Sequence, residues 1–510
     1  MKKKMIFMLC IGVVVLVLVV IAAIHVYQTY ANQTVQNDSY NIVLSGDTSI
    51  NVDAYSFKKV IYQVHNINEG TLNYGIGYFS ENSNVVVKAY TTSVDASSGT
   101  IGANVYKNIT LAVINKSNTN ATITLSTLLG YENGGELILP TGVTQVTETV
   151  QNISEYITNL YTNASKTEVV NNSITYNYAS SVSLMNDRLG GTSSIDGGNI
   201  RYYGEDPNNY IWFGDTYTSG FTQEGTVSAL GYGNVENCII SEGYSQDEGR
   251  IQCTENIVRQ SGDKKLYRII GVFDNMIKVI SDDSIGFFSW DRSESSVNNG
   301  FGINEWTQAD LMKLLNPGFN NESINNSLYW TGGSGNCYSI MENASSCDLS
   351  NFGLSDFAKN RISSVDWKLG GYNDSQGYAN TYYGYERGVN HIANPADNFA
   401  RSDGWNGKVG LMHVSDFAYA ADFSLCNKAI NQYNTTSCVL NDWLRYIDWN
   451  WTLSSGTTNP SHVWFVDFDG DISTSNASYG SAAVHPVFYL DANVIFSSGD
   501  GSREHPYVIE

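Results

Sequence analysis

Six of the seven cysteines form three pairs that are close in sequence, and this spacing is the clearest chemical pattern in the chain. Cys10 stands apart, within an apolar run near the N-terminus. In an exported chain an even number of cysteines favours disulfides, and none of the spacings fits the C-x2-4-C arrangement of a zinc site. Six cysteines allow other connectivities, so the pairing rests on proximity. The predicted disulfides are Cys238–Cys253, Cys337–Cys347 and Cys426–Cys438.

Motifs typical of catalysis are missing from the sequence. Bridged cysteines have no thiolate for a Cys–His pair. The seven histidines do not form H-E-x-x-H, and no Gly-rich phosphate cradle or G-x-S-x-G elbow stands between a strand and a helix. We therefore predict no catalytic residue and no cofactor. The paired carboxylates of a glycoside hydrolase stay open as an alternative, because the fold alone sets their separation.

Three acidic residues, Asp467, Asp469 and Asp471, alternate around Gly470 and suggest a weak calcium site. Alternate residues of a hairpin share one face, so three carboxylates and backbone carbonyls could gather around a cation. The order of these residues does not match an EF-hand loop, and no distant Glu completes it. We favour a solvated turn, with calcium as the weaker alternative.

Four tyrosines are the best candidates for a binding surface. Tyr378, Tyr382, Tyr383 and Tyr385 lie in a polar stretch that we predict to be a loop. Exposed aromatic rings beside Asn and Asp can stack on sugar faces, and such rings also dominate protein-binding hot spots. The tryptophans of the C-terminal part are expected to fill the core instead.

The N-terminal segment and the net charge indicate the cellular location and the partners of the protein. Lys2, Lys3 and Lys4 precede an apolar run, 5–24, of about the 20 residues that cross a bilayer. We predict a transmembrane helix with a cytoplasmic N-terminus and all later residues outside the cell; a cleaved signal peptide is the alternative. A net charge of −22 over 510 residues excludes nucleic acid as a partner for the bulk of the protein.

The periodicity of the chain predicts three further parts. Short β-rich runs spaced by turn residues over 31–146 predict a sandwich of immunoglobulin-like architecture. Apolar residues at helical spacing over 147–173 predict a helical spacer. Mixed helices and strands over 174–510 predict an α+β head, with helices at 307–315 and 355–365 and a hairpin around Asp469-Gly470.

Several motifs of the head carry a family resemblance. They include Trp451-Thr452-Leu453-Ser454-Ser455-Gly456, then His462-Val463-Trp464-Phe465-Val466, then Val484-His485-Pro486-Val487-Phe488-Tyr489-Leu490. The pattern extends upstream to Leu184 and resembles the C-terminal domain of a large family of uncharacterised bacterial membrane-anchored surface proteins. Its layout is similar to C-type-lectin-like and formylglycine-generating-enzyme-like folds. The chain departs from the family at His485, where the family usually has Arg.

The expected fold class is therefore α+β multidomain: an N-terminal transmembrane helix within 1–30, an immunoglobulin-like β-sandwich, a helical spacer and a C-type-lectin-like α+β head. The expected location is the cell membrane, with a single pass and the later domains extracellular. We expect a non-catalytic binding or adhesion module for an extracellular glycan or protein. The alternatives are an extracellular enzyme of formylglycine-generating-like or hydrolase type, and a structural cell-envelope component.

Overall fold

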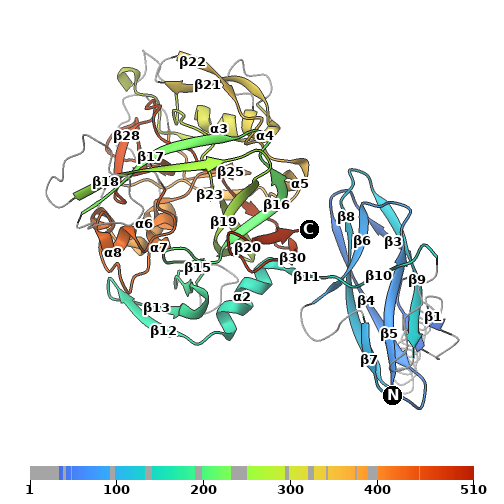
Figure 1. Ribbon diagram of the computed structural model, residues 1–510. Helices are drawn as coiled ribbons and strands as arrows, with labels where there is room; N and C mark the ends of the chain where they lie inside the picture. The colour runs from blue at the N-terminus through green and yellow to red at the C-terminus, as the bar shows by residue number, and fades with distance from the viewer. Residues whose placement is uncertain are drawn as a thin grey trace, which may run out of the picture. The chain divides into compact units, whose positions relative to one another are not determined.

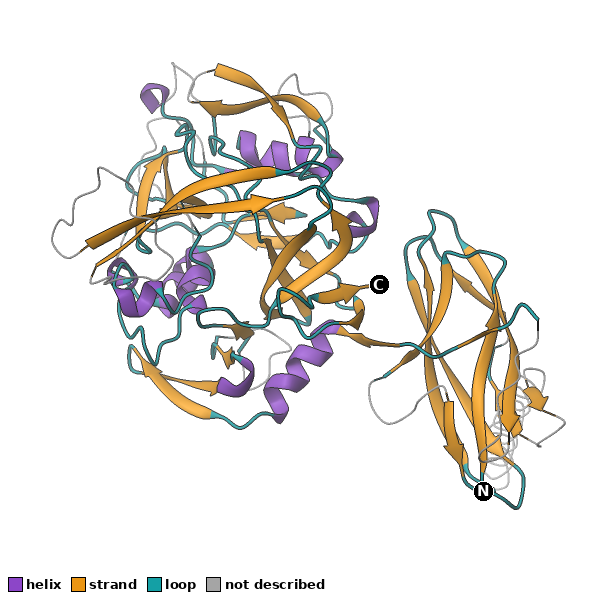
Figure 2. Cartoon of the chain, in the orientation of Figure 1, coloured by secondary structure: helices purple, strands orange, loops and turns teal. Residues whose placement is uncertain are grey.

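The computed structural model divides the chain into two compact units, one up to Gln151 together with Glu510 and the other from Asn152 to Ile509 (Figure 1). It describes residues 34–37, 42–47, 49–91, 98–131, 141–189, 198–230, 250–292, 298–319, 327–340, 343–373, 376–388, 400–446 and 448–510. Strands account for 42% and helices for 15% of the structure (Figure 2). The predicted α+β class is therefore wrong, because the protein is mostly β.

The predicted transmembrane run, 5–24, lies outside the described residues. Among the helices that the structure does describe, none combines the length and the apolar character needed to cross a bilayer. The transmembrane helix in the predicted fold is therefore not supported.

The first unit is a β-sandwich of two sheets. Strand β4 (Phe57–Asn66) pairs antiparallel with β8 (Tyr106–Asn115), which pairs with β6 (Val85–Tyr90). In the other sheet β5 (Leu72–Phe79) and β3 (Ser49–Val52) flank β9 (Ala121–Tyr131). The remaining strands extend the sheets; they are β1 (Thr34–Asn37), β2 (Ile42–Ser45), β7 (Ser98–Ile101), β10 (Thr144–Gln145) and β11 (Thr149–Asn152).

The alternation of buried and exposed residues in β4 shows how the strands form the core of the sandwich. In β4, Tyr62 and Val64 are buried while Ile61 is 67% exposed. Successive side chains of a strand point to opposite faces, so one face of β4 meets the other sheet and the other meets water. Buried residues from both sheets form one apolar cluster.

The second unit is built around a sheet whose middle strands are buried on both faces. Strand β19 (Lys264–Phe273) pairs with β20 (Met276–Ser281), and β20 pairs with β29 (Val487–Leu490). Their near-continuous apolar sequences explain why they lie in the centre. Flanking strands are β12 (Thr167–Asn171), β13 (Ile174–Ala179), β14 (Leu184–Asn186), β15 (Ile200–Tyr202), β16 (Tyr210–Thr216), β25 (Val409–Gly410), β30 (Ile495–Ser498) and β31 (Tyr507–Ile509).

Short helices pack on this sheet. Helix α2 (Ile153–Asn163) contacts β19 and β20 through its apolar stripe, so the helix of the predicted spacer, 147–173, packs into the second unit's core. The other helices are brief: α3 (Asp310–Leu315), α4 (Leu328–Thr331), α5 (Asp356–Lys359), α6 (Ala379–Glu386), α7 (Val414–Ala420) and α8 (Thr436–Val439). Of the two predicted helices, 307–315 appears as a 3-10 turn followed by α3, while 355–365 shortens to α5.

Small sheets and two disulfides complete the second unit. The predicted hairpin is confirmed: β27 (His462–Val466) pairs with β28 (Ile472–Asn476), and β26 (Asn450–Ser455) adds to β27. The other pairs are β17 (Phe221–Leu230) with β18 (Arg250–Arg259), β21 (Ser334–Ile340) with β22 (Asn343–Asp348), and β23 (Val365–Lys368) with β24 (Gly404–Gly407). The predicted disulfides Cys337–Cys347 and Cys426–Cys438 are confirmed, with Cα atoms 6.1 and 4.7 Å apart. Cys238, and with it the third predicted pairing, lies outside the described residues.

Candidate functional site

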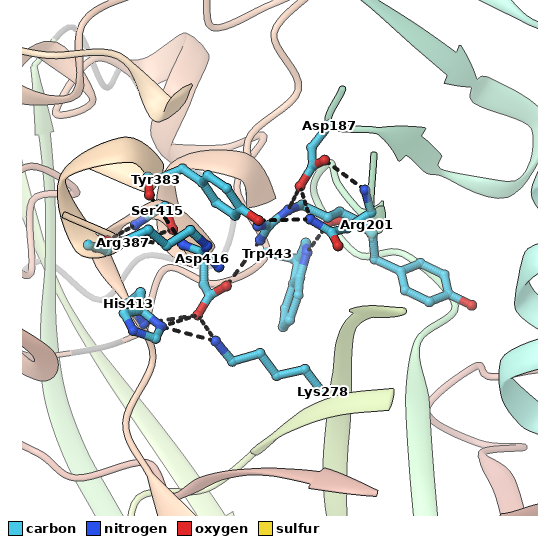
Figure 3. Close-up of polar contacts among 12 residues, drawn as sticks. Asp187, Arg201, Lys278, Tyr383, Arg387, His413, Ser415, Asp416 and Trp443 are labelled. Atoms are coloured by element: carbon cyan, nitrogen blue, oxygen red, sulfur yellow. Dashed lines mark hydrogen bonds and ion pairs between the residues drawn. The ribbon is translucent and has the colours of Figure 1, made fainter. Parts of the chain in front are cut away.

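A fully buried ion network lies at one face of the central sheet of the second unit (Figure 3). It starts at Arg201 in β15, whose side chain is 1% exposed. The Nε atom of Arg201 donates to Asp187 at 2.6 Å, and its Nη1 atom donates to Asp416 at 3.0 Å. Asp187 also accepts hydrogen bonds from the backbone and the side-chain amide of Asn199. One guanidinium thus bridges a loop carboxylate and a helix carboxylate.

Asp416 joins this arginine to a buried lysine and a histidine. It is the third residue of α7, and its Oδ2 atom accepts the backbone N–H of His413, the residue that caps the helix, at 2.9 Å. The same oxygen accepts the ammonium of Lys278 from β20. The Lys278 Nζ atom also lies 3.2 Å from His413 Nδ1. The network therefore ties β15, β20 and the start of α7 together.

The charges of the network balance, with two carboxylates and two cations. Burial raises the pKa of Asp416, but Lys278, the hydrogen bond from His413 and Arg201 outweigh burial and hold it well below its usual value. Burial lowers the pKa of Lys278, and the contact with Asp416 opposes that shift. Buried ions need such partners, because an unpaired one would carry a large desolvation cost.

His413 is fixed in one tautomer by its two neighbours. Its Nε2 atom lies 2.9 Å from the backbone carbonyl oxygen of Lys368, which can only accept, so Nε2 carries the proton. Its Nδ1 atom is then the acceptor for the Lys278 ammonium. Both ring nitrogens are committed to these bonds. A general base needs a free nitrogen within reach of the substrate proton, so the geometry of His413 suits support better than proton transfer.

A cavity of about 460 Å³ lies directly over this network and shares His413 with it. Its lining combines aromatic rings with side chains of both charges. The residues are Asn199, Phe273, Asp274, Met276, Val365, Asp366, Trp367, Lys368, Tyr383, Arg387, His413 and Tyr489. This mixture of apolar surface and a few polar groups is typical of a site for a small organic ligand.

The rings of the cavity are held in place by one another and by the charges. Trp367 of β23 lies edge-on to Tyr489 with ring centroids 5.3 Å apart, and its indole N–H donates to the carbonyl of Gly407. The guanidinium of Arg387 lies 3.3 Å from the centroid of the Tyr383 ring. Arg387 and Lys368 are solvent-exposed at the rim. The cavity therefore offers rigid rings beside accessible hydrogen-bond donors.

The four predicted binding tyrosines are not together on a surface loop. They belong to helix α6 and its cap, because Tyr382 is fully buried and holds the segment against the core. Tyr383 is also buried but lines the cavity, and Tyr378 is half-buried. Tyr385 is 38% exposed and stacks on Tyr372 with ring centroids 5.6 Å apart. The four side chains therefore do not form one exposed surface; Tyr383 lines the cavity, and a binding role for the others stays a prediction.

The three aspartates of the predicted calcium site do come together. One oxygen from each of Asp467, Asp469 and Asp471 lies within 4.8 Å of the others. Burial and the neighbouring Asp469 raise the pKa of Asp467 to about 6, although its carboxylate accepts the indole N–H of Trp449 at 2.8 Å. The bonds of the turn explain the cluster without an ion, so calcium stays the weaker prediction.

The ion network has no counterpart among the sequence predictions, although one signal in the strands points to it. Lys278 interrupts the apolar run of β20, and Arg201 sits within the buried strand β15. A charge inside a central strand is rarely buried without a partner. That pattern predicts a buried ion pair but does not identify the acid that completes it.

Comparisons with protein-family models, with curated proteins and with solved structures give no match to this chain, so the family resemblance stays a prediction and function must be argued from the site.

Proposed function

We propose that the second unit binds a saccharide outside the cell without changing it chemically. The observation that carries this proposal is the cavity over the ion network, where the rings of Trp367, Tyr383 and Tyr489 adjoin Asp366, Lys368 and Arg387. Sugars present apolar C–H faces that pack on aromatic rings, and hydroxyls that need both donors and acceptors. The cavity supplies both.

The bonds that His413, Lys278 and Asp416 make within the protein favour structural support over proton transfer by these three groups. His413 is the one histidine in the described lining, and both of its nitrogens are bonded within the protein. Lys278 and Asp416 lie beneath the cavity lining and pair with each other. Catalytic acids and bases need a proton that they can exchange with the substrate. These groups instead stiffen the floor of the cavity.

Export is supported by the two disulfides. Such bridges persist in oxidising compartments and are rare in the cytosol. Both bridges join cysteines close in sequence, at separations of 10 and 12 residues. They stabilise loops of the same unit that carries the cavity, as expected for a binding unit exposed outside the cell.

A glycan array followed by calorimetry tests the proposal. The full chain should bind at least one saccharide, and Lys368→Ala should weaken that binding roughly tenfold, because losing one charge-assisted hydrogen bond costs about 1.5 kcal/mol. Lys58→Ala is the matched control, since it removes the same charge from an exposed position of the first unit. Absence of any bound saccharide would refute the proposal, and chemical turnover of the bound sugar would favour the hydrolase alternative.

A further inference from the structure

A second cavity, of about 420 Å³, lies in the same unit and shares no lining residue with the first. Strands β17 and β18 form one wall through Phe221 and Ile257. Phe287 and Phe352 contribute further rings from separate loops. Tyr446 and His485 also line the cavity, with their rings stacked at a centroid distance of 3.7 Å. The cavity is thus assembled from parts of the chain that are far apart in sequence.

The walls of this cavity are aromatic and partly open to solvent. Phe221 and Phe352 lie edge to face with ring centroids 5.0 Å apart, which fixes both rings. Phe287 is 42% exposed, an unusual position for a large apolar ring at the mouth of a cavity. Aromatic faces carry partial negative charge and attract cations as well as apolar groups.

Three polar groups that line the cavity, His485, Asp448 and Glu224, offer hydrogen-bond acceptors. His485 Nδ1 lies 3.0 Å from the carbonyl oxygen of Ser281, so Nδ1 carries the proton and Nε2 is an acceptor. Burial lowers the pKa of His485 to about 4, so this ring is neutral at physiological pH. Asp448 and Glu224 add carboxylates. The amide of Gln223 is already used, because it donates to the carbonyl of Ser284 at 2.5 Å.

No cation compensates these acceptors within the described lining. That lining includes neither Lys nor Arg. Arg259 lies on β18 two residues beyond Ile257, but its Nε and Nη2 atoms each donate to Asp283 at 2.7 Å. Burial raises the pKa of Asp448, as expected for a carboxylate that has lost water without gaining a cation. The charge of the cavity is therefore complementary to a positive ligand.

We propose that this second cavity binds an organic cation, an ammonium group carried on an apolar or aromatic body. The rings of Phe221, Phe287 and Phe352 would surround the apolar body, and the carboxylates of Asp448 and Glu224 would attract the ammonium. A neutral ligand would leave the carboxylates unpaired, and an anion would be repelled by them. The site is independent of the saccharide proposal.

Calorimetry on the full chain with three ligands of similar size tests this inference. The probes are benzylammonium, benzyl alcohol and benzenesulfonate. We expect the cation to bind at least about tenfold more tightly than the alcohol, given combined cation–π and carboxylate attraction, and the sulfonate not to bind. Equal binding of the cation and the alcohol, binding of the sulfonate, or no binding of the cation would overturn the proposal.

Two variants locate the binding. Asp448→Asn keeps the shape of the side chain, and Asn tolerates the backbone φ of 85° at this position. It should weaken cation binding about fivefold, and Phe287→Ala about threefold to tenfold. Glu205→Gln, which removes an exposed charge elsewhere in the unit, is the matched control. Unchanged affinity in both cavity variants would place the cation elsewhere and refute the assignment.

Lys368→Ala should leave cation binding intact, which separates this test from that of the saccharide site.

Discussion

Removing Lys278 should destabilise the second unit strongly. The variant Lys278→Met keeps the apolar stem of the side chain but leaves Asp187 and Asp416 to share the single cation Arg201. Both partners of the broken pair are about 2% exposed, so water cannot replace the ammonium. Breaking a buried pair on one side costs about 3–5 kcal/mol. Because Arg201 still contacts Asp416, we expect a loss of unfolding free energy of about 3 kcal/mol, at the low end of that range.

Urea unfolding followed by tryptophan fluorescence measures this loss. All ten tryptophans lie between Trp212 and Trp464, so the signal reports the second unit alone. The double variant Lys278→Met with Asp416→Asn restores the balance of charge between Arg201 and Asp187. Its loss of unfolding free energy should be about 2 kcal/mol smaller than the sum of the losses of the two single variants. Lys359→Met is the control, because its partner Asp356 is 73% exposed and the pair should contribute less than about 1 kcal/mol. The proposed role of the Lys278–Asp416 pair would be refuted if the effects of the two single variants simply added in the double variant. A loss of unfolding free energy below about 1 kcal/mol for Lys278→Met would also refute it.

Two further predictions concern the stability of the same unit. Burial and the neighbouring Asp310 raise the pKa of Asp291 to about 7, from 3.8 in the unfolded chain. Between pH 3.8 and pH 7 the folded state therefore binds one more proton than the unfolded state, and the free energy of unfolding falls as the pH rises through this range. Between pH 5 and pH 8 the unfolding free energy of Asp291→Asn should fall by roughly 2–3 kcal/mol less than that of the wild-type protein. The same pH dependence in the variant and the wild type would contradict this prediction. Replacing Cys426 and Cys438 together by Ala opens a loop of 12 residues between two buried cysteines and should cost about 3 kcal/mol in urea unfolding. An unchanged midpoint and slope would show that the bridge contributes nothing.

Local sequence patterns predicted the β-sandwich, two disulfides and one hairpin. Strands β4, β5, β6, β8 and β9 cover the runs picked out by their β-branched and aromatic residues, since alternation is visible within a few positions. The disulfides Cys337–Cys347 and Cys426–Cys438 and the hairpin around Gly470 are equally local. The balance of strand and helix was not predicted, because the helices around 307–315 and 355–365 shorten where packing on the sheet overrides the periodicity.

The site could not be predicted because its parts meet only in the folded chain. Lys278 and Asp416 are 138 positions apart, and no spacing rule connects them. Helix α6 has no apolar stripe, so its sequence resembles a polar loop until the burial of Tyr382 fixes it. The charges of Lys278 and Arg201 within buried strands were the available signal, and they indicated buried partners without identifying them.

A crystal structure of the protein with the saccharide that binds most strongly on the array tests the central claim most directly. We predict an intact sugar in the cavity over the ion network, with its ring against Tyr489 or Tyr383 and its hydroxyls bonded to Lys368, Asp366 or Arg387. A sugar bound on another surface, or one cleaved at its glycosidic bond, would contradict non-catalytic saccharide binding at this cavity.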